Sequence, residues 1–252
     1  MSVTFSRKSA LNPDAGLLSL VAAITMVIDH VGSALLPSVP VLRVIGRIAF
    51  PLYCMGIVQG CIHTKNHLKY ALRLLLFALI SQPAYMLGLN HSLKELNVIF
   101  TLLLGMLSVW GIQEKRFLSH LWMPAIALTL SAVFKMDYGW RGVLLIILMY
   151  LSSGTKSGFS AMFIAFCLMW GNHSFDLFPF LRIPSPFNMG NVFLERLGSL
   201  VTSFFRLQTM ALLALPLMVT DTHSGIRRSR LVYAIYPGHL IVLWFLTNYV
   251  LK

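Results

Sequence analysis

The sequence predicts an all-α protein, a polytopic transmembrane bundle of about 8–10 helices. Of its 252 residues, 57% are hydrophobic and only 11% are charged, and the mean hydropathy is +0.76. Soluble domains carry roughly a quarter charged residues, so an ordinary soluble protein is excluded. Apolar runs of about 20 residues, each long enough to cross a bilayer, recur from Ala15 to Val250. We therefore expect residues 1–252 to form a single integral membrane domain.

The apolar runs define the expected helices, which cover residues 15–37, 41–63, 68–89, 96–113, 118–134, 139–153, 158–171, 198–220 and 231–250. The runs at 139–153 and 158–171 hold only about 14 apolar residues, so we interpret them as tilted, re-entrant or buried in protein. The segment 171–206, which contains Pro179, Pro184 and Pro186, is predicted to be a long outer-side loop. Two interpretations of this loop stay open, a lid over a binding site and a packed connector.

The basic residues favour an orientation in which the N-terminus is cytoplasmic. Clusters at 65–69, 115–116 and 227–230 then lie inside, as the positive-inside rule requires. The first apolar run contains Asp29 and His30 and no small-residue cleavage site, so we expect an uncleaved first helix. The predicted location is the bacterial inner membrane.

The net charge of +12 does not indicate nucleic acid, because the basic residues are scattered at segment ends and form no stripe. The expected partner is the lipid bilayer. Cys54, Cys61 and Cys167 lie in apolar segments without CxxC or CxxH spacing, so we expect neither a disulfide framework nor a metal site.

Charged residues inside the expected helices are the main functional signal. Each costs at least about 2.5–3.5 kcal/mol to insert, so such residues usually face the bundle interior. Asp29 and His30 lie in the first helix, and Arg43 and Arg47 lie one turn apart in the second, where Pro51 is expected to bend the chain. The helical rise puts Asp29 and Arg47 at similar depths, so we expect an ion pair between them.

The last helix adds His239, within the run Tyr236-Pro237-Gly238-His239. A single buried polar residue usually serves as a hydrogen bond between helices. Two imidazoles, a carboxylate and a guanidinium together are what proton transfer and anion stabilisation require. We therefore predict a catalytic site formed by His30, Asp29, Arg47 and His239.

At these residues the sequence resembles the TraX family, membrane proteins associated with N-acetylation of conjugative pilin. The matching segments are AAITMVIDHVG at 22–32, GRIAFP at 46–51, NVIFTL at 97–102, DYGWRGV at 137–143 and YPGHL at 236–240. They come in the order of the family and span most of the chain.

The resemblance implies a membrane-embedded acyltransferase, N-acetyltransferase-like, that moves an acetyl group from acetyl-CoA to an acceptor amine or hydroxyl. The N-terminus of pilin is the family's best-known acceptor. The family is also distantly similar to transmembrane acyltransferases that use a first-helix histidine and embedded arginines, which His30 and Arg47 match. A basic residue common about three turns before that histidine is here Ser19.

In the working hypothesis, cytoplasmic basic residues hold the phosphates of CoA, and these are Lys65, Lys69, Arg73, Arg227, Arg228 and Arg230. His30 takes the acceptor's proton, and Arg47 or His239 faces the developing oxyanion. Asp29 poises the site through Arg47 or holds the acceptor's ammonium. Direct transfer is favoured, and an acetyl-histidine intermediate stays open.

Two other functions use the same residues. A proton-coupled transporter would use the buried Asp, His and Arg as a relay, although no internal repeat typical of transporters is visible. A non-catalytic assembly factor for conjugation or secretion would use them only as hydrogen bonds between helices.

Overall fold

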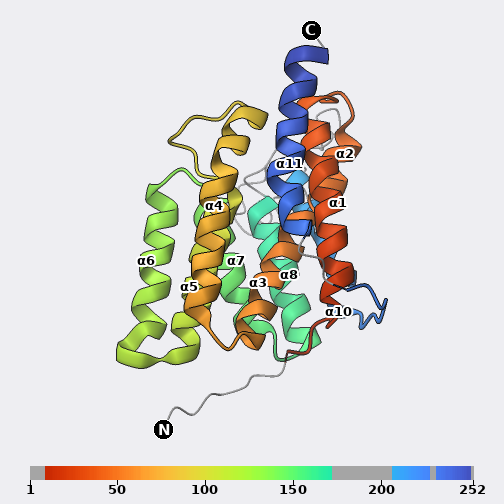
Figure 1. The fold of residues 1–252 in the computed structure, drawn as a ribbon. Coiled ribbons are helices and arrows are strands. Elements are labelled where there is room, and N and C mark those ends of the chain that lie inside the picture. The colour runs from red at the N-terminus through yellow and green to blue at the C-terminus, as the bar shows by residue number, and fades with distance from the viewer. Residues whose placement is uncertain (1–8, 172–205, 228–230, 251–252) are drawn as a thin grey trace, which may run out of the picture.

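The computed structural model describes residues 9–171, 206–227 and 231–250, which form a bundle of helices and no β-strand (Figure 1). The predicted all-α bundle is confirmed. The bundle contains helices α1 (Ala15–Ala34), α2 (Pro40–Gly46), α3 (Ala49–His63), α4 (His67–Leu89), α5 (Val98–Glu114), η1 (Arg116–Leu118), α6 (Ser119–Val133), α7 (Gly139–Ser152), α8 (Lys156–Gly171), η2 (Leu207–Ala214), α10 (Leu215–Val219), α11 (Leu231–Phe245) and the π-helical η3 (Leu246–Val250).

The predicted spans agree with the helices over residues 15–171, except that one span is divided into two helices. The span 41–63 consists of two helices, α2 and α3, which are separated at Arg47 and Ile48. Of the span 198–220, residues 198–205 lie outside the described residues, and the rest forms η2 and α10. The predicted loop 171–206 also lies outside them, apart from its two end residues.

Polar side chains fix where several helices begin. Asp14, Asn66 and Asn97 precede α1, α4 and α5, and each accepts a hydrogen bond from a first-turn N–H, at 3.0, 2.8 and 3.0 Å respectively. Such caps satisfy backbone donors that have no partner within the helix. The backbone N–H groups of Ser224 and Leu17 also hold the pKa of the Asp14 carboxyl near 2, so Asp14 ties residues 222–224 to the start of α1.

The helices carry apolar side chains on their outer faces as well as inside. Within the described part of the chain, three helical stretches are long and apolar enough to cross a membrane, and these are Ala15–Ala34, Pro40–His63 and His67–Leu89. On α4 and α6 the exposed large apolar residues include Leu68, Leu72, Leu76, Leu79, Ile80, Leu121, Trp122, Ile126 and Val133. Water would make such continuous apolar faces unfavourable, whereas lipid covers them at no cost. The chain is therefore a membrane protein.

The helices alternate in direction, so the bundle has two distinct ends (Figure 1). The start of α1 and the loops after α3, α5 and α7 lie at one end, called here the N-terminal end. The loops after α1, α4 and α6 and the end of α11 lie at the opposite end. α1 packs against α2, α3 and α11, and α11 also packs against α4. Two cavities lie between these helices.

Candidate functional site

A cavity of about 800 Å³ lies between the helices near the opposite end. Helices α1, α2, α3, α4 and α11 and the loop before α7 contribute to its wall. Its ionisable lining residues, apart from tyrosines, are Asp29, His30, Arg43, Arg47, His91 and Asp137. The cavity thus gathers in one place charges that lie more than a hundred residues apart in the sequence.

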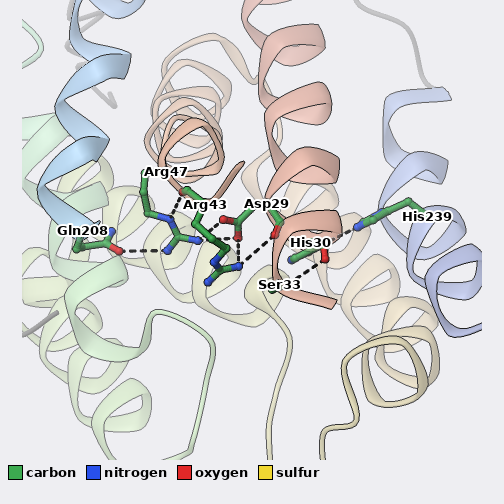
Figure 2. Close-up of polar contacts among 7 residues, drawn as sticks. All are labelled: Asp29, His30, Ser33, Arg43, Arg47, Gln208 and His239. Atoms are coloured by element: carbon green, nitrogen blue, oxygen red, sulfur yellow. Dashed lines mark hydrogen bonds and ion pairs between the residues drawn. The ribbon is translucent and has the colours of Figure 1, made fainter. Parts of the chain in front are cut away.

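Asp29 forms a buried ion pair with Arg47, as the sequence predicted (Figure 2). The Arg47 Nη2 donates to both carboxylate oxygens, at 2.5 and 2.6 Å, and the two residues are only 7% and 8% exposed. Arg43 adds a second ion pair, in which its Nη1 lies 3.0 Å from the Asp29 Oδ2. One carboxylate therefore serves two guanidinium groups, and this trio carries a net charge of +1.

The break between α2 and α3 sets the position of Arg47. Pro51 has no N–H, so the Arg47 carbonyl loses its usual helical donor. The N–H groups of Arg47 and Ile48 bond to the carbonyls of Val44 and Ile45, three residues back, in a tightened turn. The predicted bend therefore lies at Arg47 itself, and the guanidinium turns toward Asp29 and Gln208, whose Oε1 accepts from the Arg47 Nη1 at 3.3 Å.

Gly46 allows α1 and α2 to approach at this point, because a Cβ there would overlap the Asp29 side chain. Gly46→Ala is therefore expected to destabilise the protein by about 1–3 kcal/mol through overpacking. Gly56→Ala is the matched control, since no atom lies within 4 Å of its added Cβ and alanine favours the helix. Unfolding by sodium dodecyl sulfate in mixed micelles measures both. Equal stability of the two variants would contradict the close approach.

His30 and His239 form a hydrogen-bonded pair between α1 and α11. The His30 Nδ1 lies 2.6 Å from the His239 Nε2, and the two rings are almost parallel, with an angle of 5° between them. The other nitrogen of His239, Nδ1, lies 2.7 Å from the carbonyl oxygen of Ile235. His30 lines the cavity, whereas His239 is not among the described residues that do and lies behind His30.

If both rings are neutral, this arrangement allows one pair of tautomers. A carbonyl oxygen only accepts, so the His239 Nδ1 carries a hydrogen and donates it to Ile235. The His239 Nε2 then has a lone pair and accepts a hydrogen from the His30 Nδ1. The His30 Nε2 is left with a lone pair of its own. His30 is thus held as a base, on the wall of a cavity that also contains two arginines.

Asp137 lies in the short loop before α7 and also lines the cavity. Its N–H donates to the Leu96 carbonyl at 3.0 Å, and its own carbonyl accepts from the Thr101 Oγ1 at 2.5 Å. Burial raises the pKa of the Asp137 carboxyl to about 6, against the opposing charge of Arg47. The backbone is therefore fixed on two sides at a residue that lines the cavity.

The neighbouring loop carries a second charged group at the cavity rim. The His91 Nδ1 lies 2.7 Å from the Glu95 Oε2, and Lys135 forms an ion pair with the same carboxylate. The Lys135 ammonium, a Ser92 N–H and His91 hold the pKa of Glu95 near 2. These bonds join the loop after α4 to the loop after α6, which carries Asp137.

A second cavity, of about 630 Å³, lies toward the N-terminal end. It is largely apolar, and its wall includes Leu18, Leu52, Leu74 and Phe77. Four residues line both cavities, and these are Met26, Tyr53, Val98 and Tyr236. The Tyr53 hydroxyl donates to the Met26 sulfur at 3.5 Å. The two cavities therefore adjoin at these four side chains, one facing each end of the bundle.

The predicted phosphate-binding residues lie away from the charged cavity. Lys65, Lys69 and Arg73 are exposed at or near the N-terminal end, and the Arg73 guanidinium lies 5.3 Å from the centre of the Tyr70 ring, which lines the second cavity. Arg227 is exposed near the start of α1, where the Ile226 carbonyl contacts Gly16. Arg228 and Arg230 lie outside the described residues. Among the described residues, no group of three or more His, Cys, Asp or Glu gathers as a metal site.

Sequence reasoning grouped Asp29, His30, Arg47 and His239. The structure places the first three on the cavity and His239 behind His30, and it adds Arg43, Asp137 and Gln208. Arg43 was visible one turn before Arg47, and the family-like motif at 137–143 begins with Asp137. Neither Arg43 nor Asp137 was part of the predicted site. Gln208 carried no signal, because it follows a long segment without a clear span.

These observations define a class of protein: a helical membrane protein with a histidine and an arginine–carboxylate cluster in a cavity between its helices. The chain belongs to the TraX family, since the TraX protein family matches residues 15–247. The resemblance found in the motifs is thus confirmed over most of the chain.

Two further proteins are similar to parts of the chain. The probable fimbrial assembly protein FimC, serogroup H1, of Dichelobacter nodosus is 33% identical over 136 residues, which are 48% of this chain and 55% of that protein. An uncharacterized protein of Rickettsia prowazekii (strain Madrid E) is 50% identical over 38 residues, 15% of each chain. The first match thus spans about half the length of that relative, and the second spans far less. No solved structure matches the chain.

Proposed function

We propose that the protein is a membrane-embedded acetyltransferase that moves an acetyl group from acetyl-CoA to an acceptor amine or hydroxyl. The N-terminus of a pilin is the proposed acceptor. The family supports this proposal, as does the similarity to a protein named for fimbrial assembly. The protein would span the bacterial inner membrane several times, with a cytoplasmic N-terminus.

The observation that carries the proposal is the chain of bonds from Ile235 through His239 to His30, a residue that lines the cavity. For neutral rings, this chain places a hydrogen on the His30 Nδ1 and leaves a lone pair on its Nε2. A base in this position removes the proton from an attacking amine or hydroxyl. A histidine that served only to join two helices would not need a free nitrogen on a cavity.

Arg43 supplies the complementary positive charge. Both hydrogen bonds from its side chain to Asp29 come from one nitrogen, Nη1, and the side chain is 31% exposed. Arg47 is more fully engaged, with Asp29, Gln208 and the Arg43 carbonyl as partners. In the proposed reaction Arg43 therefore faces the developing oxyanion, and Arg47 fixes the shape of the cluster.

The two adjoining cavities support separate routes for donor and acceptor. The acetyl-CoA phosphates would bind near Lys65 and Lys69 at the N-terminal end, and the apolar cavity would take the pantetheine arm. The acceptor would enter the charged cavity from the opposite end. The thioester and the acceptor would meet at the partition formed by Met26, Tyr53, Val98 and Tyr236.

In the proposed step, the lone pair of the acceptor amine attacks the thioester carbonyl carbon. A C–N bond forms, the C–S bond breaks, and the CoA sulfur leaves with the electron pair. His30 takes the proton from the amine through Nε2 and returns it to the sulfur. The products are an N-acetylated acceptor and free CoA, and no covalent enzyme intermediate is needed.

The test uses the full chain, purified in lipid nanodiscs, with acetyl-CoA and an octapeptide that has a free N-terminus. We expect release of CoA thiol that depends on the peptide, and a peptide mass increased by one acetyl group. If acetyl-CoA neither binds nor is consumed, even when a membrane extract supplies acceptors, the proposal is wrong. The same buried charges would then serve a transporter or an assembly factor.

The donor route predicts a separate effect at the N-terminal end. The double substitution Lys65→Gln with Lys69→Gln removes two exposed charges and is expected to raise the KM for acetyl-CoA about fivefold, or about 1 kcal/mol, with little change in kcat. Lys94→Gln, an exposed charge at the opposite end, is the control. Initial rates at low and high salt measure the effect, which salt should weaken. An equal change in the control variant would contradict the donor route.

A further inference from the structure

We propose that Asp137 binds the positively charged ammonium of the acceptor before transfer, and so selects an amine over a neutral group. This inference rests on the proposed function and adds the residue that determines its acceptor specificity. It changes one expectation from the sequence, in which Asp29 was a candidate for the same role.

Asp29 is unsuited to hold an ammonium. Its carboxylate already receives bonds from Arg47 and Arg43, and it is 7% exposed. The trio of Asp29, Arg43 and Arg47 has a net charge of +1, so it repels a cation and attracts an anion or an oxyanion. An approaching ammonium therefore needs another negative charge on the same cavity wall.

Asp137 provides that charge. It lines the same cavity as His30, and no Lys, Arg or His of the described chain forms a salt bridge with its carboxylate. Its backbone N–H and carbonyl are bonded to Leu96 and Thr101, so the backbone at Asp137 is fixed without an ionic partner. A half-buried carboxylate without an ion-pair partner is costly, and an ammonium ligand would offset that cost.

The surroundings of Asp137 suit an alkylammonium. Tyr138 stacks on Phe50 with ring centres 3.6 Å apart, and both residues line the cavity with Asp137. Tyr53 and Tyr236 belong to the same wall. Aromatic faces attract cations, so a carboxylate among aromatic rings is a favourable environment for an ammonium.

The backbone after Asp137 is held in an unusual conformation. Tyr138 has φ 64° and Gly139 has φ 49°, both in the left-handed region that a tyrosine rarely adopts. Strain of this kind persists only where surrounding contacts impose it, and it is concentrated at functional sites. Here the turn holds the Tyr138 ring against Phe50 and places Asp137 in the cavity wall, which is the arrangement that the ammonium site requires.

Asp137 and His30 then have successive roles. The ammonium binds to Asp137 and gives one proton to water at the cavity, and the neutral amine that remains is the nucleophile. His30 removes the second proton as the C–N bond forms. A hydroxyl or an already acetylated amine has no charge for Asp137 to recognise, so neither competes with the amine for the cavity.

The test measures binding without turnover. The full chain in nanodiscs is titrated with a fluorescent octapeptide that has a free N-terminus, and with the same octapeptide acetylated at its N-terminus. For the wild type we expect the free-amine peptide to bind about tenfold more tightly. Asp137→Asn keeps the side-chain shape, and we expect it to reduce this ratio to about one and to leave binding of the acetylated peptide unchanged.

The control variant is Asp221→Asn, which removes an exposed acid paired with Lys156 at the N-terminal end. It should keep the wild-type ratio. The inference is overturned if the wild type binds both peptides equally or neither, or if Asp137→Asn keeps the preference. A preference that depends on Asp137, in a protein that releases no CoA, would support the ammonium site while the proposed acetyl transfer fails. A thermal unfolding curve verifies that the Asp137→Asn protein is folded.

Discussion

Arg47→Ala is expected to lower the free energy of unfolding by about 3–5 kcal/mol, the range for breaking a buried ion pair. The loss is large because Asp29 lies almost out of contact with solvent, and Arg47 supplies its two shortest bonds. Removal of Arg47 also leaves the Gln208 Oε1 without this donor. Unfolding of the purified protein by sodium dodecyl sulfate in mixed micelles measures the change.

Arg43→Ala is the matched control for this prediction. It removes a guanidinium from the same carboxylate, but the side chain is 31% exposed, so a change of about 1 kcal/mol or less is expected. A loss for Arg43→Ala as large as that for Arg47→Ala would show that burial does not decide the effect. Simultaneous replacement of Asp29 and Arg47 by alanine should cost less than the sum of the single changes, because no charge is left buried without a partner.

One of the two ion pairs in the cluster of Asp29, Arg43 and Arg47 was predictable from the sequence, and the other was not. The depth of Asp29 and Arg47 follows from counting residues along two consecutive helices, so their ion pair was predictable. The second pair, with Arg43, depends on how α2 is rotated relative to α3 across the break at Arg47. The sequence pattern does not specify this rotation about the helix axis.

Contacts between distant segments could not be predicted from the sequence pattern, for a different reason. The pair of His30 and His239 joins the first helix to the last, and it required the order in which helices pack against one another. The residue types were visible in the sequence, and both histidines were assigned to one site, but the bond between them was not predictable. The position of Asp137 at the cavity was unpredictable for the same reason. Its loop is held there by bonds to Leu96 and Thr101, which depend on the packing of α5 against α7.

His30→Ala is expected to reduce acetyl transfer about 10²–10⁴-fold, the usual contribution of a general base. The reduction should fall on kcat, since the predicted phosphate-binding residues and Asp137 remain in place. Initial rates of CoA release in nanodiscs, with the octapeptide as acceptor, measure it. His223→Ala removes an exposed histidine from a segment that lines neither cavity, and it should keep the wild-type rate.

His239→Leu separates the role of positioning from that of the base. It removes the acceptor behind the His30 Nδ1, so the neutral His30 ring is free to adopt either tautomer, and only one of them has the Nε2 lone pair. We expect a lower kcat and a shifted pH profile, with an unchanged KM for acetyl-CoA. If His239→Leu kept the wild-type pH profile, the bond to His239 would not set the state of His30. If His30→Ala kept wild-type turnover, the base would have to be another residue of the cavity.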